Sequence, residues 1–202
     1  MKKQFLFLAL LMVAISYGAQ AQQYKKFKVG LGLGYASASG SGASGGVLLY
    51  LEPAYRVTDA IQVGLRIETA LVTRGLSQDL EDDASLDIAA IGSYTFNGQY
   101  YLKSSGFRPF VGLGFGLYSL AAIKVEGDGE AAAAESKFGV YPRIGFDAGH
   151  FQLSLDYNLI PKTKVDGLAY DEVANEFVPE KFEFKNSYIG VRIGVAIGGG
   201  KK

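Results

Sequence analysis

The chain of 202 residues suffices for one domain, and its 20 Lys and Arg balance 20 Asp and Glu, which excludes a basic nucleic-acid-binding protein. It has no Cys, which excludes disulfides, thiolate zinc sites and thiol catalysis, and it has a single His. Its 27 Gly, 13 Tyr and 13 Phe, with only 5 Pro, are typical of many strands joined by turns.

The first residues have the pattern of a secretory signal peptide. A positively charged start precedes the apolar run Phe5–Ile15, and the small residues Ala19 and Ala21 follow at cleavage positions. The run is too short for a membrane-spanning helix, which needs roughly 17 apolar residues or more. We therefore predict that residues 1–21 are a signal peptide, in preference to a buried N-terminal helix, and that residues 22–202 form the exported domain.

Beyond the signal peptide, apolar side chains alternate with small or polar ones. Val29 and Leu31, for example, flank Gly30, and only Leu48 and Ile91 break the rule. Because side chains along a strand have a period of two, each such segment is predicted to be a strand with one bulky apolar face. The predicted strands lie within residues 27–35, 47–57, 61–71, 86–102, 107–123, 138–147, 151–159 and 186–197.

The connections between these strands alternate in length. Tight turns are predicted at 58–59, 103–106 and 149–150, and long loops at 36–46, 74–84, 126–136 and 161–183. No helical stretch separates the strands, so neighbouring strands are antiparallel. Short turns at one end and long loops at the other are typical of transmembrane barrels. The predicted fold is all-β: an eight-stranded antiparallel up-and-down transmembrane β-barrel with short periplasmic turns and long extracellular loops.

The volume of the bulky residues predicts which face points outward. An eight-stranded barrel has room inside only for side chains, and the Leu, Ile, Val, Phe and Tyr of the apolar face would not fit there. A soluble lipocalin-like barrel would need the opposite orientation. We therefore predict a lipid-facing apolar surface and a lumen filled by paired charges, since buried charges need partners. The predicted structural charge network comprises Glu52, Arg56, Arg66, Glu68, Asp87, Arg108, Arg143, Asp147, Asp156 and Arg192.

Three segments carry a family resemblance: Phe107–Tyr118 (FRPFVGLGFGLY), 141–158 (YPRIG running on to HFQLSLDYN) and Tyr188–Val195 (YIGVRIGV). Residues 22–198 resemble the small outer-membrane β-barrel domain family of Gram-negative bacteria, with its OmpX-like, OmpW-like and OmpA-membrane-domain members. The resemblance implies an integral protein of the cell outer membrane with a structural or surface-interaction role, assembled by the barrel-assembly machinery. Likeness to the OmpW-like members implies the alternative, a narrow channel for small hydrophobic molecules or ions.

Candidate chemistry is weak. The glycine runs at 30–34 and 112–116 lie inside strands and open no helix, so they do not predict a nucleotide site. His150 and Ser154 could suggest a lipid-deacylating enzyme, but no nearby acid orients the histidine, and a solvated turn residue is favoured. A proton or ion path through the lumen charges is favoured less than sealing pairs. We expect no enzyme activity, catalytic residue, cofactor or metal site.

The later long loops are acidic. Carboxylates there could hold Ca²⁺ or Mg²⁺ bridging to lipopolysaccharide, although a solubilising surface is the favoured interpretation. The apolar residues of loop 161–183 mark either a contact site or a hairpin that extends the wall. Expected partners are outer-membrane lipid, lipopolysaccharide and an extracellular ligand bound through loops 74–84, 126–136 and 161–183, with a monomeric protein and no nucleic acid. The loop acids are Asp79, Glu81, Asp82, Asp83, Glu126, Asp128, Glu130, Glu135, Asp166, Asp171, Glu172, Glu176, Glu180 and Glu183.

Overall fold

The computed structural model describes residues 24–39, 43–75, 86–123, 135–171 and 176–200. The predicted signal peptide lies outside these residues. The described residues include no helix that could cross a membrane. The barrel wall consists of β1 (Phe27–Ala38), β3 (Gly46–Arg56), β4 (Ile61–Gly75), β5 (Leu86–Tyr101), β6 (Phe107–Ile123), β7 (Glu135–Ala148), β8 (Phe151–Asn158) and β11 (Tyr188–Gly198). Three further strands are β2 (Ala43–Ser44), β9 (Thr163–Asp171) and β10 (Glu176–Phe184).

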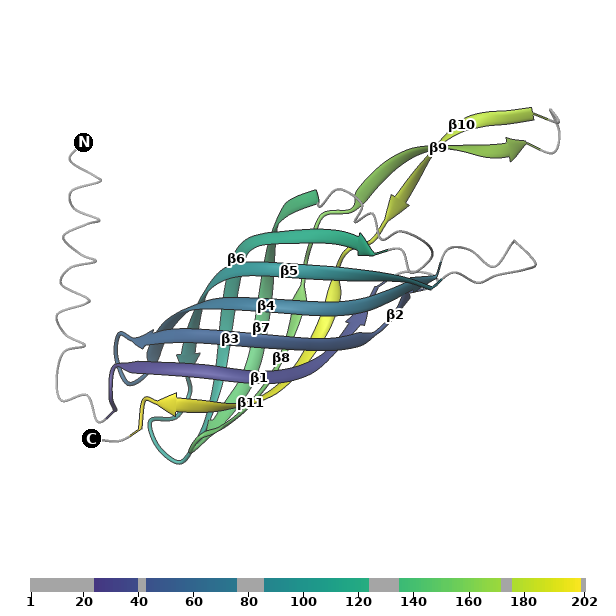
Figure 1. The fold of residues 1–202 in the computed structure, drawn as a ribbon. Coiled ribbons are helices and arrows are strands. Elements are labelled where there is room, and N and C mark those ends of the chain that lie inside the picture. Colours follow the sequence, from purple (N-terminus) through teal and green to yellow (C-terminus); the bar gives the residue numbers. More distant parts are fainter. Residues whose placement is uncertain (1–23, 40–42, 76–85, 124–134, 172–175, 201–202) are drawn as a thin grey trace, which may run out of the picture.

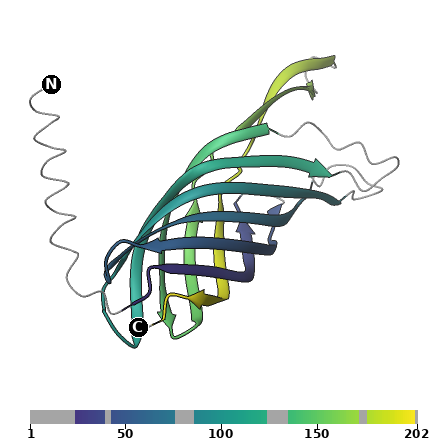
Figure 2. The same cartoon turned by 60° about the vertical axis from the view of Figure 1, so that its left-hand side comes forward.

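The wall closes into the predicted antiparallel barrel. Each wall strand pairs with the next one along the chain, and β1 pairs with β11 to complete the circle, with Leu31 opposite Val195. Figures 1 and 2 show the strands tilted around a common axis, with the start of β1 and the end of β11 at the same end of the barrel. A closed barrel leaves no unpaired sheet edge, which a strand-built protein needs in lipid.

Glycine allows the tight turns to reverse the chain in few residues. Gly106 has a φ of 67° and Gly149 a φ of 62°, which is the left-handed region that other residues rarely adopt. Both glycines lie where the sequence predicts short connections, between β5 and β6 and between β7 and β8.

The predicted long loop 161–183 is largely a β-hairpin. β9 and β10 pair from Thr163 opposite Phe184 to Asp171 opposite Glu176, and form a sheet of their own. The hairpin projects beyond the loop end of the barrel (Figure 1). The sequence left open a contact site or a hairpin for this segment, and its backbone forms a hairpin. The predicted loop 36–46 is shorter than expected, because β1 continues to Ala38 and β2 pairs with the end of β4.

Bulky apolar side chains point outward, as predicted. Leu33 is 55% exposed and Leu113 is 60% exposed, whereas the side chains of Arg66 and Arg192 are completely buried inside the barrel. A water-soluble protein rarely exposes an apolar belt of this extent. The described structure thus has its polar residues in the centre and its apolar residues on the surface.

Candidate functional site

The outward-facing residues include one row without bulky side chains near the loop end. Thr69, Gly92, Ser119 and Ser136 are register partners in succession across four neighbouring strands. The hydroxyls of Ser119 and Ser136 lie 3.2 Å apart and form a hydrogen bond. The next outward row toward the turns is bulky, ending at Phe138. This row of small and hydroxyl-bearing residues interrupts the bulky outer face of β4, β5, β6 and β7 near its loop end.

Four charged side chains form the centre of the lumen. Arg192 makes a bidentate contact with Glu68, with Nε–Oε2 of 2.6 Å and Nη2–Oε1 of 2.7 Å, and also contacts Asp156. Arg66 lies between the same two carboxylates, 3.4 Å from Asp156 and 3.7 Å from Glu68. All four side chains are fully buried. Two cations and two anions cancel, which is what a water-excluded interior requires.

Neutral polar groups complete this cluster of four charges. The Tyr188 hydroxyl donates to Glu68 at 2.7 Å, and the Asn158 amide donates to Asp156 at 2.8 Å. Tyr118 in turn donates to Asn158 at 2.8 Å. Each carboxylate therefore accepts hydrogen bonds beyond its ion pairs, which satisfies its remaining lone pairs.

The glycine stripes of the inner face make room for aromatic rings. A Cβ on Gly114 would overlap the ring of Tyr141, and one on Gly194 would overlap the ring end of Tyr50. Arg66 lies over the same Tyr141 ring, with its guanidinium carbon 3.9 Å from the ring centre. Within the alternate-glycine run 112–116, Gly114 thus makes room for a tyrosine ring.

A second ionic layer lies toward the periplasmic turns. Arg143 donates from Nη1 to both oxygens of Glu52, at 3.0 and 2.8 Å. Gln99 also donates to Glu52, at 3.0 Å. Below this layer, Lys28 pairs with Asp147 at 2.7 Å.

Asp147 has two further donors. The Tyr101 hydroxyl donates to it at 2.8 Å and Gln152 at 2.9 Å. Lys28 is a lumen residue that the predicted network omitted, although it has the same parity as Gly30.

Aromatic and guanidinium groups cap the periplasmic mouth. The guanidinium carbons of Arg56 and Arg108 lie 4.6 and 4.3 Å from the centre of the Tyr24 ring. Arg56 donates to the carbonyl of Gly199 at 2.8 Å, and Arg108 to that of Asp59 at 2.6 Å. Segments from both ends of the domain are thereby held under the barrel.

An apolar cluster closes the loop end. Leu48 and Ile91, the two exceptions to the alternation, point inward and are buried there. They pack with Val72, Ile160 and the small side chain of Ala70. We call these five residues the apolar plug. The exceptions to the pattern therefore have a structural cause, because this end of the lumen is filled by hydrocarbon rather than by ion pairs.

The structure brings together most of the predicted charge network. Glu52, Arg143, Arg66, Glu68, Asp156 and Arg192 form the inner ionic layers, and Asp147 pairs with the unpredicted Lys28. Arg56 and Arg108 lie in the periplasmic cap instead, and the side chain of Asp87 lies outside the described part of the structure. Among described residues, all five predicted cations and four of the five predicted carboxylates are buried, and Lys28 is a sixth buried cation.

His150 and Ser154, the candidate residues for a lipid-deacylating enzyme, do not form a catalytic pair. His150 lies in a turn with Nδ1 2.7 Å from the carbonyl oxygen of Ala196, so this nitrogen donates, while Ser154 is buried in the lumen. Within the described residues, no group of three or more metal-ligating side chains comes together. Most of the acids of loops 74–84 and 126–136 lie outside the described residues.

Ion pairs also occur at the base of the projecting hairpin. Lys162 and Lys164 contact Glu183 at 2.7 and 3.1 Å. The hydrogen bond from Lys162, followed by that from Lys164, holds the pKa of Glu183 below its ordinary value of 4.5. Glu183 is therefore ionised at neutral pH, and these contacts weaken only as the pH falls through that depressed value.

Comparison with known proteins identifies the fold. The family described as outer membrane protein beta-barrel domain matches residues 5–194. Neisserial surface protein A is 16% identical with a TM-score of 0.53, over 87% of this chain and 98% of that one. The outer membrane protein OprG from Pseudomonas aeruginosa is 15% identical with a TM-score of 0.54, over 89% and 99%. A search of curated proteins gave no match.

Proposed function

The chain belongs to the outer membrane protein beta-barrel domain family, and from that premise we propose that it is a sealed, non-enzymatic outer-membrane barrel with a structural and surface-interaction role. The location is the outer membrane. The role assigned to the protein rests on one observation above all: the lumen is occupied by side chains from the periplasmic mouth to the loop end.

Successive layers support a closed lumen. The Tyr24 cap and the Lys28–Asp147 pair fill the periplasmic end, and the apolar plug fills the loop end. Between them, the fully buried Arg66 and Arg192 are held by carboxylates on other strands. Moving such a charge without its partner costs several kcal/mol, roughly 3–5 by analogy with broken buried pairs. These layers therefore favour a lumen that remains closed.

The surface-interaction role belongs to the loop end. The loops carry most of the acids of the chain, and the β9–β10 hairpin extends the reach of the protein beyond the barrel. We assign binding of an extracellular ligand to loops 74–84, 126–136 and 161–183, on a monomeric barrel delivered by its signal peptide and the barrel-assembly machinery. Loops suit such variable recognition, because a rigid scaffold positions them.

Planar-bilayer recording tests the sealed lumen against the alternative, a narrow OmpW-like channel for small hydrophobic molecules or ions. We expect the refolded wild-type protein to give no stable unit currents, because side chains of the described residues fill the lumen in successive layers. A discrete unit current that disappears in Leu48→Trp would contradict the proposal. Leu49→Trp is the matched control, because Leu49 is 60% exposed on the outer face while the neighbouring Leu48 is buried in the plug.

A further inference from the structure

The seam between β7 and β8 has a short ladder of paired residues. Its recorded ladder runs only from Ala148 opposite Phe151 to Arg143 opposite Asp156. A single bridge follows, Val140 with Leu159. Pro142 lies between the ladder and this bridge, and proline has no N–H with which to continue the pairing.

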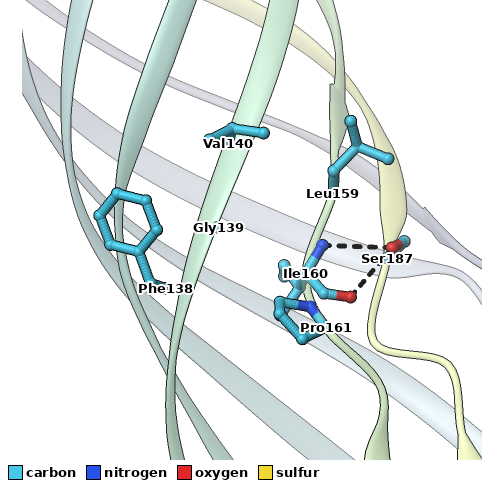
Figure 3. A pocket seen from close by; sticks show the side chains of 7 residues that line it. All are labelled: Phe138, Gly139, Val140, Leu159, Ile160, Pro161 and Ser187. Atoms are coloured by element: carbon cyan, nitrogen blue, oxygen red, sulfur yellow. Dashed lines mark hydrogen bonds between the residues drawn. The ribbon is translucent and has the colours of Figure 1, made fainter.

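The chain beyond β8 turns away from β7 toward β11. The Ser187 hydroxyl accepts from the N–H of Ile160 at 3.2 Å and donates to its carbonyl at 3.3 Å (Figure 3). Asn186 donates to the carbonyl of Pro161 at 2.7 Å. Ile160 also places its side chain in the apolar plug. Its backbone N–H and carbonyl bond to Ser187, next to β11, and a groove lies on the side of β7.

Two apolar grooves follow this seam on the outer wall. The upper one, of 340 Å³, lies between Phe138 and Val140 on β7 and Leu159 and Pro161 beyond β8 (Figure 3). The lower one, of 220 Å³, is lined by Pro142 and Ile144 on one side and Leu155 and Tyr157 on the other. We call the two together the seam groove. It opens onto the lipid-facing belt, since Phe138 and Ile144 are 57% and 55% exposed on that surface.

Two lysines adjoin residues that line the upper end of the seam groove. Lys137 precedes Phe138, and Lys162 follows Pro161, so each adjoins a lining residue along the chain. The Lys137 amino group donates to the carbonyl of Lys162 at 2.7 Å and thus bridges the seam. With the nearby Lys164, three cations face two carboxylates, Glu135 and Glu183. Among the described side chains of this cluster, cations outnumber carboxylates by one.

We propose that the seam groove and its lysines form a binding site for one phosphorylated acyl-chain lipid of the outer leaflet, the lipopolysaccharide class. An acyl chain lies along the groove, and a headgroup phosphate is held by Lys162 and Lys164. Both side chains are well exposed, at 51% and 70%, so they can exchange their contact with Glu183 for a phosphate. Exposed ion pairs contribute little free energy, so this exchange costs little.

The two halves of the site select the same ligand. A free phosphate would use the lysines but leave the groove empty, and a zwitterionic lipid would use the groove without complementing the excess charge. Continuity of the groove with the apolar belt gives an acyl chain direct entry from the bilayer. The site lies on the outer wall, so the inference goes beyond the proposed function and does not depend on whether the lumen conducts.

Binding measurements on the full-length protein in nanodiscs of phosphatidylcholine test the proposal. Native mass spectrometry counts bound hexa-acylated lipid A, carrying two phosphates, against the same lipid with its phosphates removed. We expect preferential binding of the phosphorylated lipid, and about a thirtyfold weaker apparent affinity in Lys162→Gln/Lys164→Gln, given roughly 1 kcal/mol for each of the two lysines at a lipid surface. Lys103→Gln, in a periplasmic turn, is the control and leaves binding unchanged.

A second pair of variants tests the groove itself. Leu159→Trp fills the upper part of the seam groove and is expected to reduce lipid A binding at least as strongly, whereas Leu49→Trp on the opposite part of the belt has no effect. Heat-dependent migration on gels shows that each variant is folded before it is compared. Equal binding of both forms of lipid A, an equal loss in Lys103→Gln, or competition by inorganic phosphate alone would overturn the assignment.

Discussion

Replacing Glu68 by Gln lowers the free energy of unfolding by about 3–5 kcal/mol, because it leaves two buried arginines with one carboxylate. Arg192 loses its bidentate partner and Arg66 one of its two carboxylates. The measurement is urea-induced unfolding from lipid vesicles, followed by the change in gel migration. This is the largest effect expected of any single change in the lumen, since Glu68 also accepts the hydroxyl of Tyr188.

Two controls separate this effect from a general loss of charge. Glu183→Gln breaks an ion pair at the exposed base of the hairpin and should leave the unfolding curve nearly unchanged. The double change Glu68→Met/Arg192→Met removes both partners and should recover part of the lost stability, because apolar replacements avoid the unpaired charge. A wild-type curve for Glu68→Gln would show that the central charges do not hold the barrel together.

Leu113→Arg should destabilise the folded barrel by about 2–4 kcal/mol, because it places a charge on the lipid-facing wall near the middle of the bilayer. Leu113 is 60% exposed and lies halfway along the outward row of β6. The same unfolding assay in vesicles measures the effect. In a water-soluble barrel, this substitution at an exposed position would cost almost nothing.

The control for Leu113→Arg is the same change at a position near the membrane interface. Leu102→Arg changes a residue of equal exposure just beyond the periplasmic end of β5, where a charge reaches the interface and should cost about 0–1 kcal/mol. Equal effects of the two substitutions would contradict a bilayer around this wall. A larger effect at Leu113 would follow the depth dependence of lipid exposure.

Much of the fold could be predicted because strand parity is a local property. Alternation of apolar with small residues indicates which side of each strand faces lipid, and Leu33 and Arg192 lie as their parity predicts. Parity does not predict depth along the barrel. Leu48 and Ile91 therefore look like errors in the pattern until the apolar plug shows that both lie at the loop end of the lumen.

Pairing inside the lumen could not be predicted, because it depends on the stagger between distant strands. Arg192 and Glu68 are 124 positions apart, and nothing in either segment selects the other. Lys28 was not predicted to join the lumen charges, because the residues that follow it on the same face are glycines. It nevertheless contacts Asp147. The seam groove is equally non-local, since Pro142 becomes informative only when β8 lies beside it.

The side on which the bulky residues lie is the central claim, and quenching of single tryptophans tests it most directly. The chain has no Trp, so each introduced residue is the only one. Outward positions Leu33 and Leu113 and inward positions Tyr50 and Tyr141 are replaced by Trp one at a time in vesicles containing brominated acyl chains. The account predicts strong quenching at the two leucines and little at the two tyrosines. Equal quenching at all four positions, or stronger quenching at the tyrosines, would contradict it.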